Sequence, residues 1–332
     1  MPFPLAGCAV LGMITAVPGS CSGPPTSSWD RDHAKHRADR RNPRRRCGGA
    51  GPRAAARGRG FRAAATGPWP AWGAADPRQR IGARALRDFS LRFGPIQTGV
   101  ADRFRDPEVP EVGILSNIRR DGAPIGLADA GQDWHTDMTY TATRGFVNVL
   151  HAVEVPMRDG RPLGDTLFAN MHAAYDDLPA EVQQRLDGMT ATHDFNIFWE
   201  RMRTRPGSSR PPLTAAQRAA RPPAVHPVFL RHPITGRRVL YCNPGYAERI
   251  NELDAAESAR ILEFLFAHQL QPKYQHAHRW SVGDVLIWDH LGTLHNAIPD
   301  YGPDEHRLML RCQVMAERIF DPAFQQLWLK AA

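Results

Sequence analysis

The chain has 332 residues, of which 42% are hydrophobic and 23% are charged. This composition excludes a wholly disordered chain and gives no reason to expect an integral membrane protein. The net charge of +8 is unevenly placed, because residues 1–87 hold 16 lysines and arginines against 4 acidic residues, whereas residues 88–332 hold 26 against 30. The basic character therefore belongs to the first quarter, and only that quarter could attract nucleic acid through charge.

Residues 1–80 form an Arg/Gly/Ala/Pro-rich segment that we expect to be disordered. From Cys21 to Arg80 the sequence contains no Ile, Leu, Val or Met, so it cannot bury enough apolar area to offset the entropy of ordering. Interleaved arginine and glycine can follow a phosphate backbone, but few aromatic side chains are present to stack on bases. Nucleic-acid binding is therefore not favoured as the function.

The sequence has the features of a cytoplasmic protein. No Lys or Arg precedes the apolar run near the start, as a secretory signal would require. No run of about 18 apolar residues occurs that could span a membrane. The five cysteines include no CxxC pair and no even set of disulfide partners. We therefore expect a reducing compartment and no membrane partner.

From Leu86 onward, the sequence shows the periodicities of one packed domain. Thr235-Gly236, between two strand-like runs, predicts a hairpin turn. The predicted helices lie at 179–186, 215–220 and 254–269. The predicted strands lie at 112–118, 146–153, 165–169, 225–230, 237–242, 285–288 and 308–314. Many short strands and few helices predict a mainly β fold with helical decoration, a sandwich or a barrel.

The first chemical motif is Trp134-His135-Thr136-Asp137. In an extended segment, residues two apart point to the same face, so His135 and Asp137 could offer an imidazole nitrogen and a carboxylate oxygen to one metal ion. At average composition, such a His-x-Asp pair is expected about once by chance in a chain with this many histidines. The motif alone therefore also fits a surface histidine beside a solvated aspartate.

A second cluster lies downstream, in Trp288-Asp289-His290-Leu291 and in His295. One histidine from this region would complete two histidines and one carboxylate around a metal, the ligand set of non-haem Fe(II) oxygenases. Ligand type alone does not exclude Zn or Mn. Arg307 and Arg311 lie four apart on an apolar strand, hence on one face. They predict carboxylate binding, because burying an unpaired charge is costly.

The sequence from about Phe89 to about Ile319 resembles the TauD/TfdA family, the taurine and 2,4-dichlorophenoxyacetate dioxygenases that depend on Fe(II) and 2-oxoglutarate. Several motifs in the family's order carry this resemblance. They are FSLRFGPI at 89–96, WHTDMTY at 134–140, GDTLFANMHAAYDDLP at 164–179, HPVFLRHPITGRRVLY at 226–241, LFAHQLQPKYQHAHRWSVGDVLIWD at 265–289, LHNA at 294–297 and RLMLRCQV at 307–314. The fold implied is a double-stranded β-helix, or jelly roll, of the clavaminate synthase-like type.

The resemblance also implies the site residues. The implied iron ligands are His135, Asp137 and His295. Thr166 matches the hydroxyl that binds a carboxylate of 2-oxoglutarate, and Arg307 matches the arginine that pairs with the distal carboxylate of that cosubstrate. Arg311 matches the position that holds the anionic group of the substrate, and Trp288 matches a tryptophan beside the metal, although it fits a plain core residue equally well.

The implied reaction consumes O₂ and 2-oxoglutarate, releases succinate and CO₂, and hydroxylates a small anionic substrate, either a carboxylate or a sulfonate. Two departures from the family pattern bear on this expectation. His290 stands where members commonly have the Asn of a WDN motif, so it is a rival ligand, but the spacing of His295 to Arg307 favours His295. No histidine lies between Ile96 and Trp134, where the taurine branch binds its substrate, so the phenoxyacetate branch is the better match.

The start of the chain is the larger departure. Family members precede the FSLRFG segment with strands and a helix, and here that stretch is Arg-rich, as a misassigned start or a shifted reading frame would produce. On this hypothesis the catalytic domain, 86–325, lacks its usual N-terminal elements. An inactive or truncated jelly roll that binds metal or an anion without turnover is then the alternative to an active dioxygenase. An unpaired strand edge would also favour a homo-oligomer.

Overall fold

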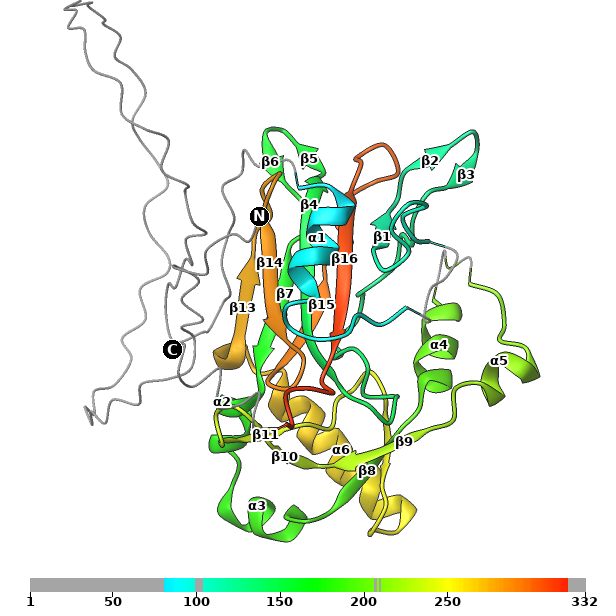
Figure 1. The fold of residues 1–332 in the computed structure, drawn as a ribbon. Coiled ribbons are helices and arrows are strands. Elements are labelled where there is room, and N and C mark those ends of the chain that lie inside the picture. Colours follow the sequence, from blue (N-terminus) through cyan, green and yellow to red (C-terminus); the bar gives the residue numbers. More distant parts are fainter. Residues whose placement is uncertain (1–80, 99–103, 206–207, 209, 322–332) are drawn as a thin grey trace, which may run out of the picture. The chain divides into compact units, whose positions relative to one another are not determined.

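Two antiparallel sheets form the frame of the protein (Figure 1), in a computed structural model that describes residues 81–98, 104–205, 208 and 210–321. The first sheet has the order β1-β16-β4-β14, and the second has the order β13-β7-β15. Their strands are β1 (Gly113–Ser116), β4 (Gly145–Glu154), β14 (Val285–Asp289), β16 (Leu308–Met315), β7 (Thr166–Asn170), β13 (Gln275–His278) and β15 (Thr293–Ala297). Strands that are distant in sequence pair in both sheets, as the predicted jelly roll requires.

The remaining described strands form one small sheet and three two-stranded ladders. The small sheet, of order β12-β8-β9, contains β8 (Thr190–His193), β9 (Ala224–Pro227) and β12 (Ala247–Ile250). The ladders pair β10 (Phe229–Arg231) with β11 (Arg238–Leu240), β2 (Arg119–Arg120) with β3 (Ala123–Pro124), and β5 (Met157–Arg158) with β6 (Arg161–Pro162). The predicted turn at Thr235-Gly236 joins β10 to β11, and Gly236 there has a φ of 68°, which glycine adopts without steric cost.

The described helices are short except for α6 (Ala255–Gln269), which has 15 residues. The others are α1 (Ala83–Ser90), α2 (Met171–Asp176), α3 (Ala180–Leu186), α4 (Phe195–Arg203), α5 (Ala215–Ala219) and the 3₁₀ helix η1 (Pro272–Tyr274). Side-chain caps begin several of them: Asp254 accepts a hydrogen bond from the Glu257 amide at α6, and Asp194 accepts one from the Asn196 amide at α4. Within the described residues, no helix combines the length and apolar character needed to cross a bilayer.

The two faces of the first sheet bury different sets of side chains. Cross-strand partners share a face, so Leu150 of β4, Leu286 of β14 and Arg311 of β16 point between the two sheets. Trp288 also points between the sheets, where it packs edge-on against Phe168 of β7. The opposite face is covered by α1, whose Leu86 is only 1% exposed in the main apolar core (Figure 1). The inner face therefore holds polar side chains, such as Arg311, among apolar ones.

Most predicted elements are confirmed, and the differences have local causes. The predicted strand 225–230 is divided into β9 and β10 at Val228, whose amide still donates to the Met189 carbonyl beside β8, whereas its carbonyl accepts from the Tyr241 amide on the β11 side. The predicted helices correspond to α3, α5 and α6, whereas α1, α2 and α4 were not predicted. The predicted disordered segment, 1–80, lies outside the described residues, and the domain limits 86–325 remain a prediction.

Two buried histidines in the small sheet make stability depend on pH. His193 is 0% exposed and neither of its ring nitrogens has a hydrogen-bond partner in the described part of the chain. Burial lowers the pKa of His193 to about 3 and that of the neighbouring His226 to about 4. Both groups titrate near pH 6.5 in an unfolded chain, so below that pH the unfolded state binds more protons than the native state.

We therefore expect the free energy of unfolding to be unaffected by these groups above about pH 6.5 and to fall as the pH is lowered toward 4, by up to about 1.4 kcal/mol per pH unit for each group. His193→Phe removes one titrating ring and should make this fall shallower. Chemical denaturation of both proteins across this pH window measures the slope. Equal slopes for the two proteins would contradict the assignment.

Candidate metal centre

The centre is built on a backbone bridge between His135 and His295. The His135 amide donates to the His295 carbonyl at 3.1 Å, and the His295 amide donates back to the His135 carbonyl at 2.8 Å. Directly bridged residues place their side chains together, and the two imidazole rings are 4.3 Å apart. His295 belongs to β15, so the bridge attaches the segment that carries His135 to the second sheet.

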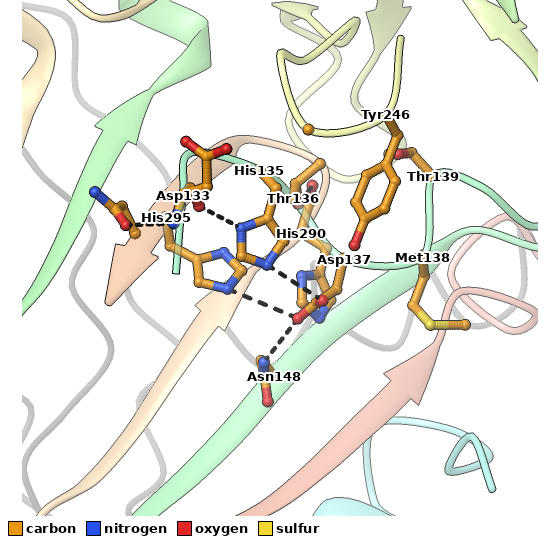
Figure 2. A network of polar contacts seen from close by, with 12 residues as sticks. Asp133, His135, Thr136, Asp137, Met138, Thr139, Asn148, Tyr246, His290 and His295 are labelled. Carbon is orange, nitrogen blue, oxygen red and sulfur yellow. Dashed lines mark hydrogen bonds and ion pairs between the residues drawn. The ribbon is translucent and has the colours of Figure 1, made fainter. Parts of the chain in front are cut away.

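Asp137 completes a group of three potential ligands. Its Oδ1 lies 3.5 Å from Nε2 of His135, and its Oδ2 lies 3.7 Å from Nε2 of His295 (Figure 2). One ligand atom from each of the three residues lies within 4.8 Å of the others, and all three residues are buried. Two imidazoles and one carboxylate on one side of a point suit a divalent metal that keeps its other positions open.

His135 lies in a β-bridge, and a turn begins at Asp137, in which Met138 has a φ of 67°. The side chains of His135 and Asp137 meet, as the His-x-Asp spacing predicts.

Asp133 fixes the orientation of His135. The Nδ1 of His135 donates to the Asp133 carbonyl at 2.7 Å, which leaves the Nε2 lone pair free to face a metal. The Asp133 amide donates to Oδ1 of Asn296 at 2.8 Å, next to the other histidine. The Asp133 carboxylate pairs with Arg201 of α4 at 3.0 Å and with Arg205 at 2.9 Å. Asp133 thus joins both histidine segments and α4.

The electrostatics favour metal binding. Burial alone would raise the pKa of Asp137, but the contact with His135 and the charge of Arg311 outweigh it and hold that pKa well below its usual range. Burial and the proximity of His135 lower the pKa of His295 well below its ordinary value. The carboxylate is therefore ionised and the His295 imidazole is neutral, which are the protonation states that a metal requires.

His290 and Asn148 border the three residues without joining them. The ring of His290 is centred 6.4 Å from that of His295, and neither of its nitrogens has a hydrogen-bond partner among the described residues. Asn148 of β4 donates through Nδ2 to Oδ2 of Asp137 at 3.4 Å. The structure thus brings together His135, Asp137 and His295 and leaves His290 beside them (Figure 2).

Beyond the three residues, Thr166 begins β7, and Arg307 lies beside the residues that precede this strand. Thr166 is two residues along β7 from Phe168, the cross-strand partner of His295, which corresponds to about 7 Å. Arg307 is 4% exposed and lies against Gly164, where an added Cβ would be 3.4 Å from its Nε. Burial lowers the pKa of Arg307, and contact with Tyr301 partly offsets this. No carboxylate of the described residues pairs with this guanidinium.

Arg311 lies on the other side of the three residues. It is paired with Leu150 across the sheet and therefore points inward, and its Nη1 is 3.6 Å from Oδ2 of Asp137. Arg307 precedes β16, and the strand has a register shift at Leu308/Met309. The two arginines consequently serve different ends of the interior instead of one shared face of a regular strand.

Sequence reasoning missed several residues that shape this interior. Trp280 donates its indole N–H to Oγ1 of Thr166 at 3.0 Å and is 1% exposed. Phe198 of α4 packs 5.6 Å from the His135 ring, measured between centroids, and Tyr246 packs 6.1 Å from it. These side chains carry no metal-ligand or charge signal, and only Trp280 lies within a motif quoted for the family. Trp288, the tryptophan predicted beside the metal, lies 5.1 Å from the His295 ring.

The sequence and the fold both resemble those of known dioxygenases. Residues 77–313 match the profile of the taurine catabolism dioxygenase TauD, TfdA family. The chain belongs to the TauD/TfdA family. Its jelly roll agrees with a crystal structure of a taurine dioxygenase from Burkholderia xenovorans, which matches with a TM-score of 0.55 and 26% identity, over 72% of this chain and 73% of that one.

Curated TauD/TfdA relatives cover most of the described chain. Pentalenolactone F synthase of Streptomyces avermitilis is 34% identical over 270 residues, which is 76% of this chain and 85% of the relative. The alpha-ketoglutarate-dependent 2,4-dichlorophenoxyacetate dioxygenase of Cupriavidus pinatubonensis is 31% identical over 217 residues, which is 62% of this chain and 72% of the relative. The chain is thus a 2-oxoglutarate-dependent dioxygenase of this family, with Fe(II), 2-oxoglutarate and O₂ as its cofactor and cosubstrates.

Gly245 provides a test of how tightly the centre is packed. An added Cβ at this position would lie 2.5 Å from Cβ of His135 and 3.2 Å from its Cα, and neither atom can move without moving the ligand. We expect Gly245→Ala to weaken Fe(II) binding about tenfold to a hundredfold, as displacement of supporting residues does in other metal sites. Anaerobic metal titration measures the effect.

Gly82→Ala is the matched control, because an added Cβ there meets nothing within 4 Å. Circular dichroism of both variants separates a local shift of His135 from a loss of fold. Wild-type metal affinity in Gly245→Ala would show that the loop does not constrain the ligand.

Proposed function

We propose that this dioxygenase binds Fe(II) through His135, Asp137 and His295, binds 2-oxoglutarate between the iron and Arg307, and hydroxylates a small organic anion with release of succinate and CO₂. The observation that carries the proposal is the spacing along the inner face. Three buried ligands lie at one end, and Thr166 lies about two strand residues, or about 7 Å, further along β7. Beside Gly164, just before that strand, lies the buried Arg307 guanidinium, which has no carboxylate partner among the described residues.

The ligand set fits Fe(II). His135 presents Nε2, because its Nδ1 is bonded to a backbone carbonyl, His295 presents a neutral imidazole, and Asp137 presents an ionised carboxylate. All three lie on one side, which leaves positions for a chelating cosubstrate and O₂. When bound, the iron supplies the activation of O₂ that the side chains cannot perform. The role of the chain is to hold the three ligands rigidly through the His135–His295 bridge and the Asp133 contacts.

The far end fits a carboxylate of 2-oxoglutarate. The indole of Trp280 can only donate, so the Thr166 hydroxyl accepts that bond and must direct its own proton elsewhere. Arg307 and the Thr166 hydroxyl then offer donors to the same space, and a carboxylate can only accept. A bound carboxylate would also remove the cost of leaving the Arg307 charge buried without an anion.

The substrate end is defined by Arg311 and by an apolar wall. Arg311 gives a permanent positive charge beside Asp137, which favours an anionic substrate near the iron. Phe198 and Tyr246 cover His135 and exclude water from the reacting carbon. The relative named for 2,4-dichlorophenoxyacetate supports a carboxylate with an apolar body.

The first test of this function is anaerobic addition of Fe(II) and 2-oxoglutarate to the purified protein. We expect the weak visible charge-transfer band of an iron–2-oxoglutarate chelate, because both ends of the cosubstrate have a site. His135→Ala removes one ligand and should abolish the band, while circular dichroism should show an intact fold. Arg307→Gln should leave iron binding intact and raise the concentration of 2-oxoglutarate needed for the band.

Absence of the band in well-folded wild-type protein would contradict an assembled site. The chain would then fit the alternative, a jelly roll that binds metal or anion without turnover. Succinate formation that depends on Fe(II) and on an added carboxylate distinguishes turnover from binding alone.

Trp280→Phe tests whether Trp280 orients the Thr166 hydroxyl that is proposed to bind 2-oxoglutarate. The ring remains in the core, but the donor that fixes the Thr166 proton is lost. We expect the KM for 2-oxoglutarate to rise about twofold to tenfold, the range for one neutral hydrogen bond, with little change in kcat or in iron affinity. In a Thr166→Val background the same substitution should have no further effect on KM, and additive effects would show that Trp280 acts only through packing.

A further inference from the structure

Tyr246 packs its ring into an apolar cluster, while its hydroxyl makes no hydrogen bond, in the part of the chain that the structure describes, that would explain its direction. Tyr246 is 3% exposed, and its hydroxyl has no hydrogen-bond partner among the described residues. Figure 2 shows this hydroxyl directed toward Asp137, into the space beside the metal-ligand group. A phenol that is buried for packing alone usually bonds to a neighbour, as Tyr140 does to the sulfur of Met138.

The backbone that carries Tyr246 is fixed on several sides. Oδ1 of Asn243 accepts hydrogen bonds from the amides of Gly245 and Tyr246, at 3.1 and 3.2 Å. The Tyr246 carbonyl accepts from the Asp194 amide at 2.9 Å, at the start of α4. Arg201 donates to the Pro244 carbonyl at 2.8 Å. The direction of the phenol is therefore set by the loop 243–246 and does not depend on a bond made by its hydroxyl.

The hydroxyl is a neutral donor that shares its surroundings with a cation. Burial raises the pKa of Tyr246 well above its ordinary value, and the neighbouring Tyr140 and Asp137 act in the same direction. Arg311 approaches the same carboxylate of Asp137 to 3.6 Å. If Asp137 binds a metal, the Arg311 guanidinium and the Tyr246 O–H lie beside that metal, and both can donate a hydrogen bond to an acceptor.

We propose that Tyr246 is a specificity-determining residue, and that its hydroxyl and Arg311 together bind the carboxylate of an apolar organic acid. This inference rests on the proposed function and adds a second donor to the substrate site. The guanidinium supplies the charge, and the phenol supplies a donor whose direction is fixed, so a carboxylate with two acceptor oxygens can satisfy both.

The surroundings of Tyr246 determine the rest of the substrate class. Its ring packs 4.7 Å from that of Tyr140 and 4.8 Å from that of Phe198, measured between centroids. The same apolar cluster contains Met202 and Leu213, and its Phe198 and Tyr246 rings lie beside His135. A second charge or a strongly hydrated group on the substrate would be desolvated here without a partner. The acid bound by Arg311 and Tyr246 therefore has an apolar body.

The test compares two phenols of this cluster. Tyr246→Phe and Tyr140→Phe each remove one buried hydroxyl and keep the ring, and the Tyr140 hydroxyl points to Met138 instead of the interior beside the metal. The probe is 2,4-dichlorophenoxyacetate, an apolar acid, added to the anaerobic complex with Fe(II) and 2-oxoglutarate. Calorimetry gives its Kd, and the charge-transfer band reports the state of the metal site in the same sample.

We expect Tyr246→Phe to raise the Kd of the probe about tenfold to a hundredfold, the range for a hydrogen bond to a charged group, and Tyr140→Phe to leave it unchanged. Both variants should form the band at wild-type concentrations of Fe(II) and 2-oxoglutarate. In an Arg311→Gln background, which removes the charge that places the carboxylate, Tyr246→Phe should have a much smaller effect.

Three results would overturn the inference. An unchanged Kd in Tyr246→Phe would show that the hydroxyl does not contact the acid. A weakened band in Tyr246→Phe, with the Kd of the probe otherwise retained, would assign the phenol to the support of Asp137. A wild-type protein that forms the band but does not bind the probe would exclude this substrate class. Absence of the band in wild-type protein is a separate result, which rejects the proposed function itself.

Discussion

Two reciprocal backbone hydrogen bonds join His135 to His295, and the arrangement of the interior depends on this bridge. The two histidines come from distant parts of the chain, and only their direct pairing places the imidazoles 4.3 Å apart. Asp137 then needs only one turn of backbone to reach both. Since β15 also pairs with β7, the same bridge sets the distance from the ligands to Thr166. One local contact thus determines both ends of the site.

The sequence predicts the fold well in strands that are buried on both faces and in helices whose buried residues recur at a regular spacing. The strands β4 and β16 are apolar on both faces, and α6 shows a helical spacing of buried leucines. The prediction fails where the local signal is weak. The strand β13 reads Gln-His-Ala-His and owes its conformation to pairing with β7, and α1 buries a single leucine among charged neighbours. In such segments tertiary contacts decide the structure.

The site divides in a similar way. His135, Asp137, Arg307 and Arg311 could be selected because their chemistry is explicit in the residue type, whereas the family pattern was needed for His295 over His290 and for Thr166. The supporting residues could not be selected in either way, because Asp133 acts largely through its backbone carbonyl and Tyr246 through its position in the fold. The role of Gly245 is harder still to predict, because the residue matters only by having no Cβ, which lets the backbone approach His135 closely.

The aromatic wall and the iron site belong to different parts of the architecture. His295 and Thr166 lie on strands of the jelly roll, and His135 is bridged directly to one of them. Phe198 and Met202 are instead on α4, and Tyr246 is on a loop. Arg201 attaches α4 to both Asp133 and the loop, so the helix keeps its place when its apolar residues change. Substitutions in this wall therefore fall on one helix and one loop, and they leave the paired backbone that joins His135 to His295 unchanged.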